Sequence, residues 1–232
     1  MSGLLFDAPV VKTIAVDGEA AAYPVSRIFC VGRNYAAHAA EMGVEVDREA
    51  PFYFSKAADA TIASGSTIAY PPGTENYHFE MELVVAIGRP VFRISVEEAF
   101  SAVFGYGCGL DMTRRDLQLA ARAKGRPWDL GKDFEESAVF APLVKAQSVE
   151  AIGPQRIHLE VNGETKQDAH LSDLIWRVDE IVSDLSKFYH LKPGDVIMTG
   201  TPAGVDAVKA GDKITGGIDS LGGIELNIGP AE

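Results

Sequence analysis

Cysteine is scarce in this sequence, whose 232 residues include only Cys30 and Cys108. Both lie inside apolar stretches, IFCVG and FGYGCGL, a context that favours reduced, buried thiols over a disulfide framework. Two cysteines are also too few for a metal site built on thiolates. The sequence therefore excludes a small disulfide scaffold and a cysteine-ligated metal centre.

Long apolar runs and an excess of basic charge are also absent. No apolar stretch approaches the ~18 residues of a membrane span, and the N-terminal MSGLLFDAPVVK lacks a basic region and is interrupted by Asp7. Lys and Arg number 21 against 33 Asp and Glu, a net charge of −12, which disfavours nucleic acid and anionic membranes as partners. We expect a cytoplasmic protein in which a small anionic substrate needs a local cation.

The order of strand and turn signals predicts a strand-dominated α+β fold. Runs rich in apolar, β-branched or aromatic residues cover 27–32, 51–56, 81–88 and 104–110, and VIMTG, KITGGI and IELNIG follow near the C-terminus. The dipeptide Asn162-Gly163 between RIHLEV and ETKQ predicts a β-hairpin. Residues 1–22 are expected to form a short N-terminal strand and turn segment, followed by one domain over 23–232.

Helical signals are few and short. Ser95 with Glu98, and Thr113 with Asp116, match the capping-box pattern that marks helix N-termini. Two further helices are indicated by other signals: residues 34–42 have helical composition and precede Gly43, and apolar residues recur at helical spacing over 179–189. The expected helices cover 34–42, a segment beginning near Val96, 114–124 and 179–189. The predicted strands and helices do not alternate regularly, and the sequence lacks a dinucleotide-binding fingerprint. Both observations favour an α+β fold over a doubly wound fold.

The segment HFEME places three polar side chains on one face of a strand. Because side chains alternate along a strand, His78, Glu80 and Glu82 face one side and their apolar neighbours the other. Asp111 ends the buried run FGYGCGL, where a lone carboxylate is costly unless it is paired or binds a metal. Three carboxylates without thiolates favour Mg²⁺ or Mn²⁺ over zinc. Composition alone leaves open that Glu80 and Glu82 are solvent-facing residues of an edge strand.

His38 and Glu41 are three residues apart in a predicted helix, so their side chains share a face. A carboxylate beside an imidazole orients the ring and raises its basicity, which makes the pair a candidate general base for activating water. The same spacing is also common in ordinary surface contacts.

Three other segments carry polar residues that could contact a substrate. Arg115 and Gln118 share a helix face directly after Asp111, and either could bind a carboxylate or carbonyl oxygen. Lys132 lies in the loop RPWDLGKDF, and the run TGTPAGV contributes the hydroxyl of Thr201. Taken singly, each of these residues is equally compatible with a solvated surface position.

Six motifs occur in a fixed order along the chain, and together they resemble the fumarylacetoacetate hydrolase family. They are CVGRNYAAHAAEMG, HFEME, GLDMTRRDLQ, GRPWDLGKDFEESA, VNGETKQ and LKPGDVIMTGTPAGV. The resemblance extends from about Tyr23 to the C-terminus. It is closest to short members that cleave acylpyruvates, and the lysine-loop motif resembles that of bacterial fumarylpyruvate hydrolases.

This resemblance implies a fold, a cofactor and a set of site residues. The implied fold is a mixed β-sandwich roll with a few short helices, assembled as a homodimer, with Mg²⁺ or Mn²⁺ held by three carboxylates. His38 with Glu41 would activate water, and Lys132 would be the cation beside the metal. The loop VEVDREA after Gly43 would close over the substrate. By position, the implied metal ligands are Glu80, Glu82 and Asp111, and the implied substrate contacts are Arg115, Gln118, Lys56 and Thr201.

The reaction implied is hydrolysis of a carbon–carbon bond in a 2,4-dioxo acid, with fumarylpyruvate giving fumarate and pyruvate in gentisate catabolism. The same metal-enolate site could instead decarboxylate or isomerise 2-oxo diacids of the oxaloacetate or hydroxyhepta-diene-dioate type. The His38 and Glu41 pair favours hydrolysis, because decarboxylation needs no activated water. A non-catalytic binding protein is disfavoured, since it would have no use for the carboxylates, the pair and the lysine together.

Overall fold

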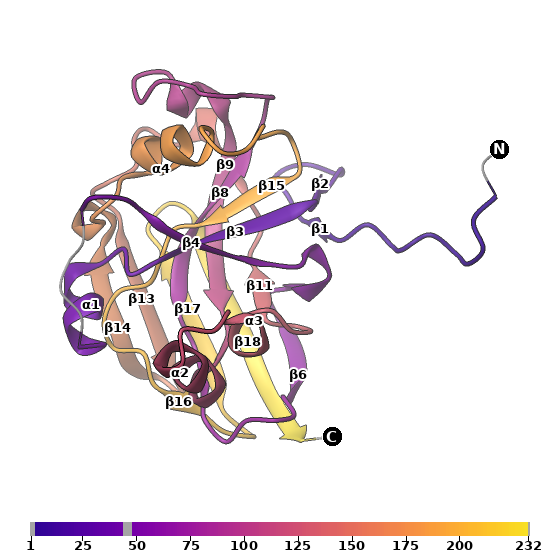
Figure 1. The fold of residues 1–232 in the computed structure, drawn as a ribbon, viewed down its shortest axis with the longest axis vertical. Helices are drawn as coiled ribbons and strands as arrows, with labels where there is room; N and C mark the ends of the chain where they lie inside the picture. The colour runs from indigo at the N-terminus through magenta and orange to yellow at the C-terminus, as the bar shows by residue number, and fades with distance from the viewer. Residues whose placement is uncertain (1–2, 44–47, 232) are drawn as a thin grey trace.

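The computed structural model describes residues 3–43 and 48–231, and an eight-stranded mixed sheet runs through it (Figure 1). The strand order is β4-β3-β15-β8-β9-β11-β5, with β12 also paired to β9. These strands are β3 (Arg27–Gly32), β4 (Phe52–Lys56), β5 (Thr61–Ala63), β8 (Met81–Ile87), β9 (Val103–Asp111), β11 (Ala138–Phe140), β12 (Val144–Lys145) and β15 (Asp195–Met198). β8 and β15 are buried along their whole length, and their sequences are apolar except for Glu82 in β8 and Asp195 in β15.

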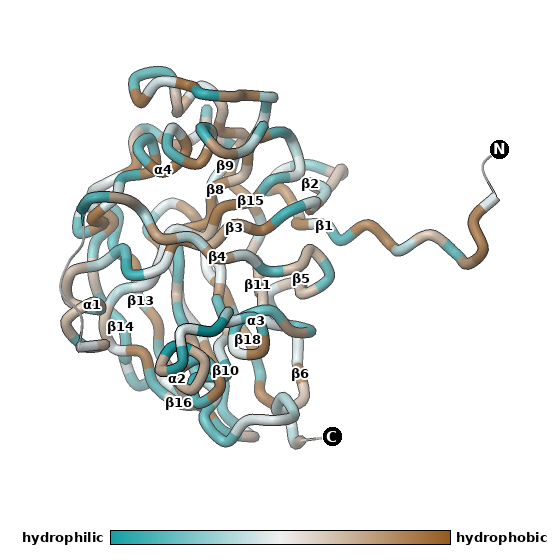
Figure 2. The backbone as a smooth tube through the Cα atoms, viewed as in Figure 1, coloured by the Kyte–Doolittle hydropathy of each residue, from teal (hydrophilic) through white to brown (hydrophobic). Residues whose placement is uncertain are grey.

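A five-stranded sheet of order β14-β13-β17-β18-β6 packs against the first. Its strands are β6 (Ser66–Tyr70), β13 (Arg156–Val161), β14 (Glu164–His170), β17 (Lys213–Ile218) and β18 (Gly222–Ala231). Ile157 and Leu159 of β13 share one apolar core with Met81 and Leu83 of β8. Figure 2 shows the apolar colour concentrated on β8, β9 and β15. The strand-dominated α+β fold expected from the sequence is confirmed.

Two small sheets complete the strands. One pairs β1 (Thr13–Ile14) with β2 (Tyr23–Pro24), and the other has the order β10-β7-β16, formed by β7 (Tyr77–His78), β10 (Thr113–Arg114) and β16 (Ala207–Val208). The chain before β1 extends away from the sheets in Figure 1. The pairing of His78 with Thr113 aligns the two segments that carry the predicted metal ligands.

The α-helices are short and lie outside the sheets. They are α1 (Ala36–Glu41), α2 (Arg115–Ala123), α3 (Asp129–Lys132) and α4 (Val178–Leu185). The 3₁₀ turns are η1 (Ala58–Ala60), η2 (Ala99–Ala102), η3 (Ala146–Ser148) and η4 (Leu171–Asp173). Gly43 has a φ of +68° and donates its N–H to the Ala40 carbonyl, so it ends α1 as the sequence predicts.

Two of the helix predictions need correction. The segment beginning near Val96 forms a turn and then the 3₁₀ helix Ala99–Ala102, because β9 begins at Val103 and leaves no room for further helical turns. The helix predicted over 179–189 ends at Leu185, after which the chain forms a turn.

The capping box predicted at Thr113 and Asp116 is also absent. The Thr113 hydroxyl donates to the Asp111 carbonyl at 3.1 Å, while Asp116 accepts from the Thr74 hydroxyl at 2.5 Å. Both side chains are thus committed elsewhere, and α2 begins at Arg115 without a side-chain cap.

Several local expectations agree with the structure. Asn162 and Gly163 have φ values of 53° and 82°, the left-handed pair that a two-residue hairpin turn requires. Cys30 and Cys108 are buried free thiols.

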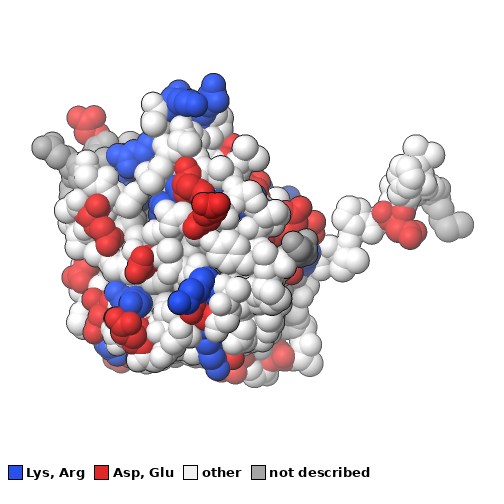
Figure 3. All heavy atoms as spheres, turned by 90° about the horizontal axis from the view of Figure 1, so that it is seen from below, with Lys and Arg blue, Asp and Glu red and all other residues white. Residues whose placement is uncertain are grey.

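Within 3–43 and 48–231, no helix has the length and apolar character needed to cross a membrane. Acidic and basic side chains are interspersed on the face shown in Figure 3.

Candidate active site

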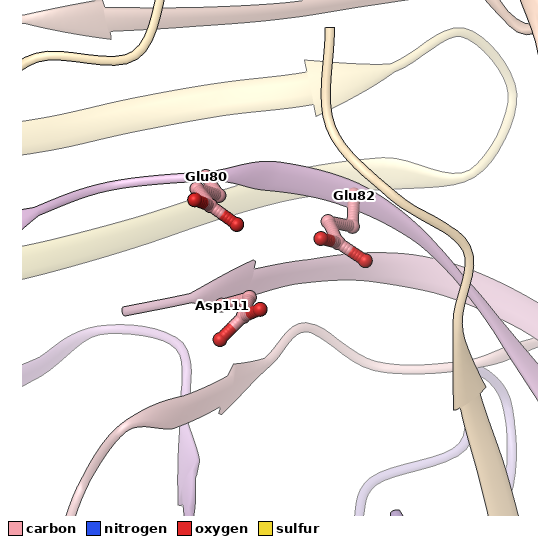
Figure 4. Close-up of side chains that lie close together, drawn as sticks. All are labelled: Glu80, Glu82 and Asp111. Atoms are coloured by element: carbon pink, nitrogen blue, oxygen red, sulfur yellow. The ribbon is translucent and has the colours of Figure 1, made fainter. Parts of the chain in front are cut away.

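The three predicted metal ligands meet in the structure. Oxygen atoms of Glu80, Glu82 and Asp111 lie within 4.8 Å of one another, and all three residues are buried. Glu82 is on β8, Glu80 directly precedes that strand, and Asp111 ends β9. The register pairs Glu82 with Gly109, and the Glu80 carbonyl accepts the Asp111 N–H at 2.9 Å. Figure 4 shows the three carboxylates on one side of the two strands, directed toward one another.

Lys132 is buried among these carboxylates. Its Nζ lies 2.7 Å from Glu80 Oε2, from Asp111 Oδ2 and from the Thr113 hydroxyl. Burial alone would lower the pKa of Lys132, but the charges of Asp111 and Glu80 hold that pKa above its usual range. The ammonium therefore remains charged although it is 2% exposed.

Lys132 reaches this position because α3 lies against α2. A Cβ atom on Gly131 would lie 2.8 Å from the backbone nitrogen of Gln118, so only glycine allows the two helices to approach this closely. The loop RPWDLGKDF thus places its lysine in the interior.

Arg115 joins Glu80 to Gln118. Its Nη2 donates to Glu80 Oε1, and its Nη1 donates to Gln118 Oε1 at 2.5 Å. Burial opposes ionisation of Glu80, yet Lys132 and Arg115 hold its pKa below the usual range. The bond to Arg115 orients the Gln118 amide so that its Nε2 donor group lies on the side away from the arginine.

Glu82 has a different environment. It accepts the Gly200 N–H at 2.7 Å, and within the described residues it makes no ion pair with a side-chain cation. Burial and the neighbouring charges of Asp111 and Glu80 raise its pKa well above the usual range. Asp111 differs from Glu82 in its ion pairing, because its Oδ1 lies 2.8 Å from Lys56 Nζ and its buried charge is therefore paired. Three buried carboxylates, among which Glu82 has no paired cation in the part of the chain that the structure describes, fit Mg²⁺ or Mn²⁺.

The predicted pair on α1 is also formed. His38 Nδ1 lies 3.1 Å from Glu41 Oε2, and the Gly204 N–H donates to both Glu41 oxygens at 3.2 and 3.3 Å. Since Nδ1 faces Glu41, Nε2 is the nitrogen available as a base. Gly204 has a φ of +97°, and a Cβ there would lie 1.9 Å from the Lys166 carbonyl oxygen. Only glycine can therefore place this N–H against Glu41.

A narrow cavity of about 30 Å³ collects most of the predicted residues. Its lining includes His38, Glu80, Glu82, Arg115, Gln118, Lys132 and Thr201. Lys56, which the sequence analysis placed at the substrate, is not part of this lining. Its Nζ lies behind Asp111, 2.8 Å from Oδ1 and 3.0 Å from the Ser137 hydroxyl. The structure thus gives Lys56 the position of a support for Asp111.

The loop expected to close over the substrate, VEVDREA at 44–50, is only partly within the described residues, because 44–47 lie outside them. Arg48 is described. Its Nη2 lies 3.1 Å from Glu180 Oε1, and its guanidinium is 4.8 Å from the Trp176 ring centroid.

Two buried amides that sequence reasoning left without a role hold this site together. Gln167 donates to the Thr201 hydroxyl at 2.8 Å and accepts the Met81 N–H at 3.0 Å. Asn34 donates to the Thr199 carbonyl at 2.8 Å. The sequence offered one sign that these two residues matter, because they lie inside the motifs VNGETKQ and CVGRNY. Composition could not show that Gln167 is buried, since the other residues of β14 are mostly polar.

Replacing Lys132 by methionine is expected to destabilise the metal-free protein by about 3–5 kcal/mol, because Glu80 and Asp111 would lose their shared buried cation. Urea unfolding without metal measures this. Saturating Mn²⁺ should recover part of the loss, since an ion that binds only the folded state stabilises it. The exposed Lys124→Met is the matched control, with a change within about 0.5 kcal/mol. Equal stability of K132M and the parent would contradict the ion-pair assignment.

Comparison with known proteins places these residues in a wider context. The model of the family described as "Fumarylacetoacetate (FAA) hydrolase C-terminal" matches residues 27–228. A fumarylpyruvate hydrolase of a Ralstonia species is 56% identical over 193 residues, covering 82% of this chain and 100% of the relative. A mitochondrial oxaloacetate tautomerase of Arabidopsis thaliana is 37% identical over 203 residues, covering 88% of this chain and 91% of the relative.

One solved structure in particular bears on the site. The crystal structure of fumarylpyruvate hydrolase from Pseudomonas aeruginosa in complex with Mn²⁺ and pyruvate superimposes with a TM-score of 0.94. The two chains are 47% identical, and the match covers 98% of this chain and 100% of the other.

Proposed function

This chain belongs to the fumarylacetoacetate hydrolase family, and we propose that it hydrolyses a carbon–carbon bond of a 2,4-dioxo acid, converting fumarylpyruvate and water to fumarate and pyruvate. The observation that carries the proposal is one cavity lined by two of the three clustered carboxylates and by His38, which is bonded to Glu41. The likeness to an enzyme solved with Mn²⁺ and pyruvate, one of the two products, supports it.

Glu80, Glu82 and Asp111 are the residues that would hold Mg²⁺ or Mn²⁺. The bound ion would supply Lewis acidity and a template for the oxygens of a 2-oxo acid. It would also offset the negative charge that these carboxylates present to an anionic substrate. Lys56 and Lys132 hold Asp111 in place from two sides, at 2.8 Å and 2.7 Å.

His38 is the proposed base for the attacking water. Glu41 accepts from Nδ1 and keeps the ring oriented, so Nε2 takes the water proton. The backbone N–H of Gly204 fixes Glu41 in turn. Attack by the water oxygen forms a bond to the distal carbonyl carbon of the substrate, whose oxygen becomes an alkoxide.

Gln118 is the hydrogen-bond donor proposed for that alkoxide, and both Gln118 and Lys132 line the cavity beside the carboxylates. The three N–H groups of Lys132 bond Glu80, Asp111 and Thr113, so Lys132 is proposed to stabilise the alkoxide by its charge, or by exchanging one of these bonds. Collapse of the alkoxide breaks the carbon–carbon bond, and its electron pair leaves as the enolate of pyruvate. The proton held on His38 returns to the enolate carbon. The distal half leaves as the carboxylic acid, which for fumarylpyruvate is fumarate.

The test is loss of the enol ultraviolet absorbance of fumarylpyruvate and of acetylpyruvate, with Mn²⁺ or Mg²⁺ and with excess chelator. We expect turnover that chelator removes and that metal restores, with fumarylpyruvate as the better substrate. Product analysis should give fumarate and pyruvate in equal amounts. Absence of turnover with every dioxo acid would reject the proposal, and turnover unaffected by chelator would reject the metal site.

A second candidate is conversion of oxaloacetate or a related unsaturated 2-oxo diacid at the same carboxylates. The similarity to an oxaloacetate tautomerase favours keeping it. Both reactions pass through an enol or enolate next to a carboxylate, so the metal ligands alone do not separate them. His38 distinguishes the two reactions, because only hydrolysis requires an activated water.

We further propose that the protein acts as a homodimer in the cytoplasm, in the breakdown of aromatic rings by way of gentisate. Phe188 and Tyr189, which are adjacent in the chain and 70% and 44% exposed, place two large apolar side chains together on the surface and support an interface between copies.

A further inference from the structure

A second cavity, of about 400 Å³, adjoins the inner one. The two share five lining residues, Arg33, Phe54, Arg122, Trp128 and Lys132. The inner cavity of about 30 Å³ has room for about two water molecules. A dioxo acid whose 2-oxo acid end sits at the carboxylates must therefore extend its distal end into the outer cavity.

Aromatic rings form one wall of the outer cavity. The Trp128 ring lies 5.0 Å from the Phe52 ring and 5.9 Å from the Phe54 ring, between centroids. Phe52 is 42% exposed, so this wall is open to a ligand. Flat apolar surfaces of this kind pack well against a planar conjugated chain.

Basic side chains surround that wall. Three arginines, Arg33, Arg122 and Arg126, line the outer cavity against one acidic residue, Asp129. Lys132 also lines it, but its charge is paired with Glu80 and Asp111. The protein as a whole carries a net charge of −12, so this local excess of cations is against the overall trend. A concave site with such an excess attracts and binds anions.

Two of these arginines are placed for a ligand in the outer cavity. Arg122 on α2 is half-buried, lines both cavities, and has a long contact of 3.4 Å from Nη1 to the Met42 carbonyl. Arg126 is exposed, and its backbone N–H donates to the Ala121 carbonyl at 2.9 Å, which fixes the turn after α2. Guanidinium groups bind carboxylates through two parallel hydrogen bonds.

We propose that Arg122 and Arg126 bind the distal carboxylate of a dicarboxylic 2,4-dioxo acid, with Trp128 and Phe52 packing on its unsaturated chain. This inference rests on the proposed hydrolase function and names the part of the chain that selects a diacid. An acylpyruvate without a second carboxylate gains the aromatic contacts but no partner for the arginines.

The test compares kcat/KM for fumarylpyruvate and acetylpyruvate, at saturating Mn²⁺, in the parent and in Arg122→Gln, Arg126→Gln and the double variant. We expect the ratio of the two kcat/KM values to fall about 10- to 100-fold, which is the usual worth of a hydrogen bond to a charged group. The change should lie mainly in KM for fumarylpyruvate, because the distal carboxylate is bound equally before and during reaction. Arg126→Lys should recover part of the ratio.

Arg89→Gln is the control, since Arg89 lies outside both cavities and bonds the Ser101 carbonyl at 3.0 Å. Its ratio should equal that of the parent. An unchanged ratio in the double variant, or an equal loss on both substrates, would overturn the inference while leaving the hydrolase function intact. Failure of the parent on all dioxo acids would instead overturn the hydrolase function and this inference with it.

Discussion

Replacing Glu82 with glutamine is expected to remove metal-dependent turnover and to leave the metal-free protein at least as stable as the parent. Glu82 is buried beside two other carboxylates, and its direct partner in the structure is the Gly200 N–H. Its pKa is raised because burial and the neighbouring charges disfavour the ionised form. Glutamine has the same shape without the charge, so it relieves repulsion at no packing cost.

The loss of function should be large. Substitution of a residue that only supports a metal ligand typically lowers metal affinity or activity about 10- to 100-fold. Loss of a ligand itself should therefore lower kcat/KM at least about 100-fold. The measurements are kcat/KM with fumarylpyruvate over a range of Mn²⁺ concentrations, and Tm with and without Mn²⁺. The rise in Tm on adding Mn²⁺ should be present in the parent and absent in E82Q.

Asp111→Asn is the matched comparison, because it removes one carboxylate charge from the same cluster. Asp111 is the partner of two buried ammonium groups, Lys56 and Lys132. Its substitution should therefore cost about 3–5 kcal/mol of unfolding free energy in the absence of metal. If E82Q destabilised the metal-free protein as much as D111N, the inference that Asp111 is paired with cations and Glu82 is not would be contradicted.

The three ligands could be predicted from the sequence because the alternation of side chains along a strand depends only on neighbouring residues. Alternation along HFEME places Glu80 and Glu82 on one face, and the end of an apolar run marks Asp111. What brings the two segments together is the antiparallel register of β8 and β9. Without the family resemblance, that pairing could not be derived from the residues.

The environment of each charged side chain could not be predicted in the same way. Lys132 and Lys56 are both buried at the carboxylates, yet one lines the cavity and the other lies behind it. That difference depends on the close approach of α3 to α2 through Gly131. Such contacts join residues distant in sequence, and no local pattern encodes them.

The capping of α2 was mispredicted for a related reason, although its predicted extent, 114–124, agrees with the observed Arg115–Ala123. The hydroxyl of Thr113, expected to cap α2, instead accepts a bond from Lys132 Nζ at 2.7 Å. A threonine can satisfy either partner, and the buried ammonium has fewer alternatives than a helix N–H exposed to water. The tertiary contact therefore outweighs the local capping motif, and the residue that breaks the rule belongs to the site.

Replacing His38 with alanine is expected to separate hydrolysis from decarboxylation. Hydrolysis of fumarylpyruvate should fall about 10²- to 10⁴-fold in kcat, the usual contribution of a general base. Any decarboxylation of oxaloacetate should persist, because it needs the carboxylate cluster but no activated water. The rise in Tm with Mn²⁺ should also persist, since His38 is bonded to Glu41 and is not one of the three clustered carboxylates. Steady-state rates on both substrates, with Mn²⁺ saturating, measure the separation.

Two further variants make the result interpretable. His190→Ala removes an exposed histidine that stacks on Phe92 with ring centroids 4.0 Å apart, and both rates should be unchanged. Glu41→Gln keeps a hydrogen-bond acceptor for His38 but loses the charge, so hydrolysis should fall less than in H38A. An equal loss of both activities in H38A would show that His38 serves a proton transfer common to the two reactions. The enolate, and not the water, would then be the species on which this histidine acts.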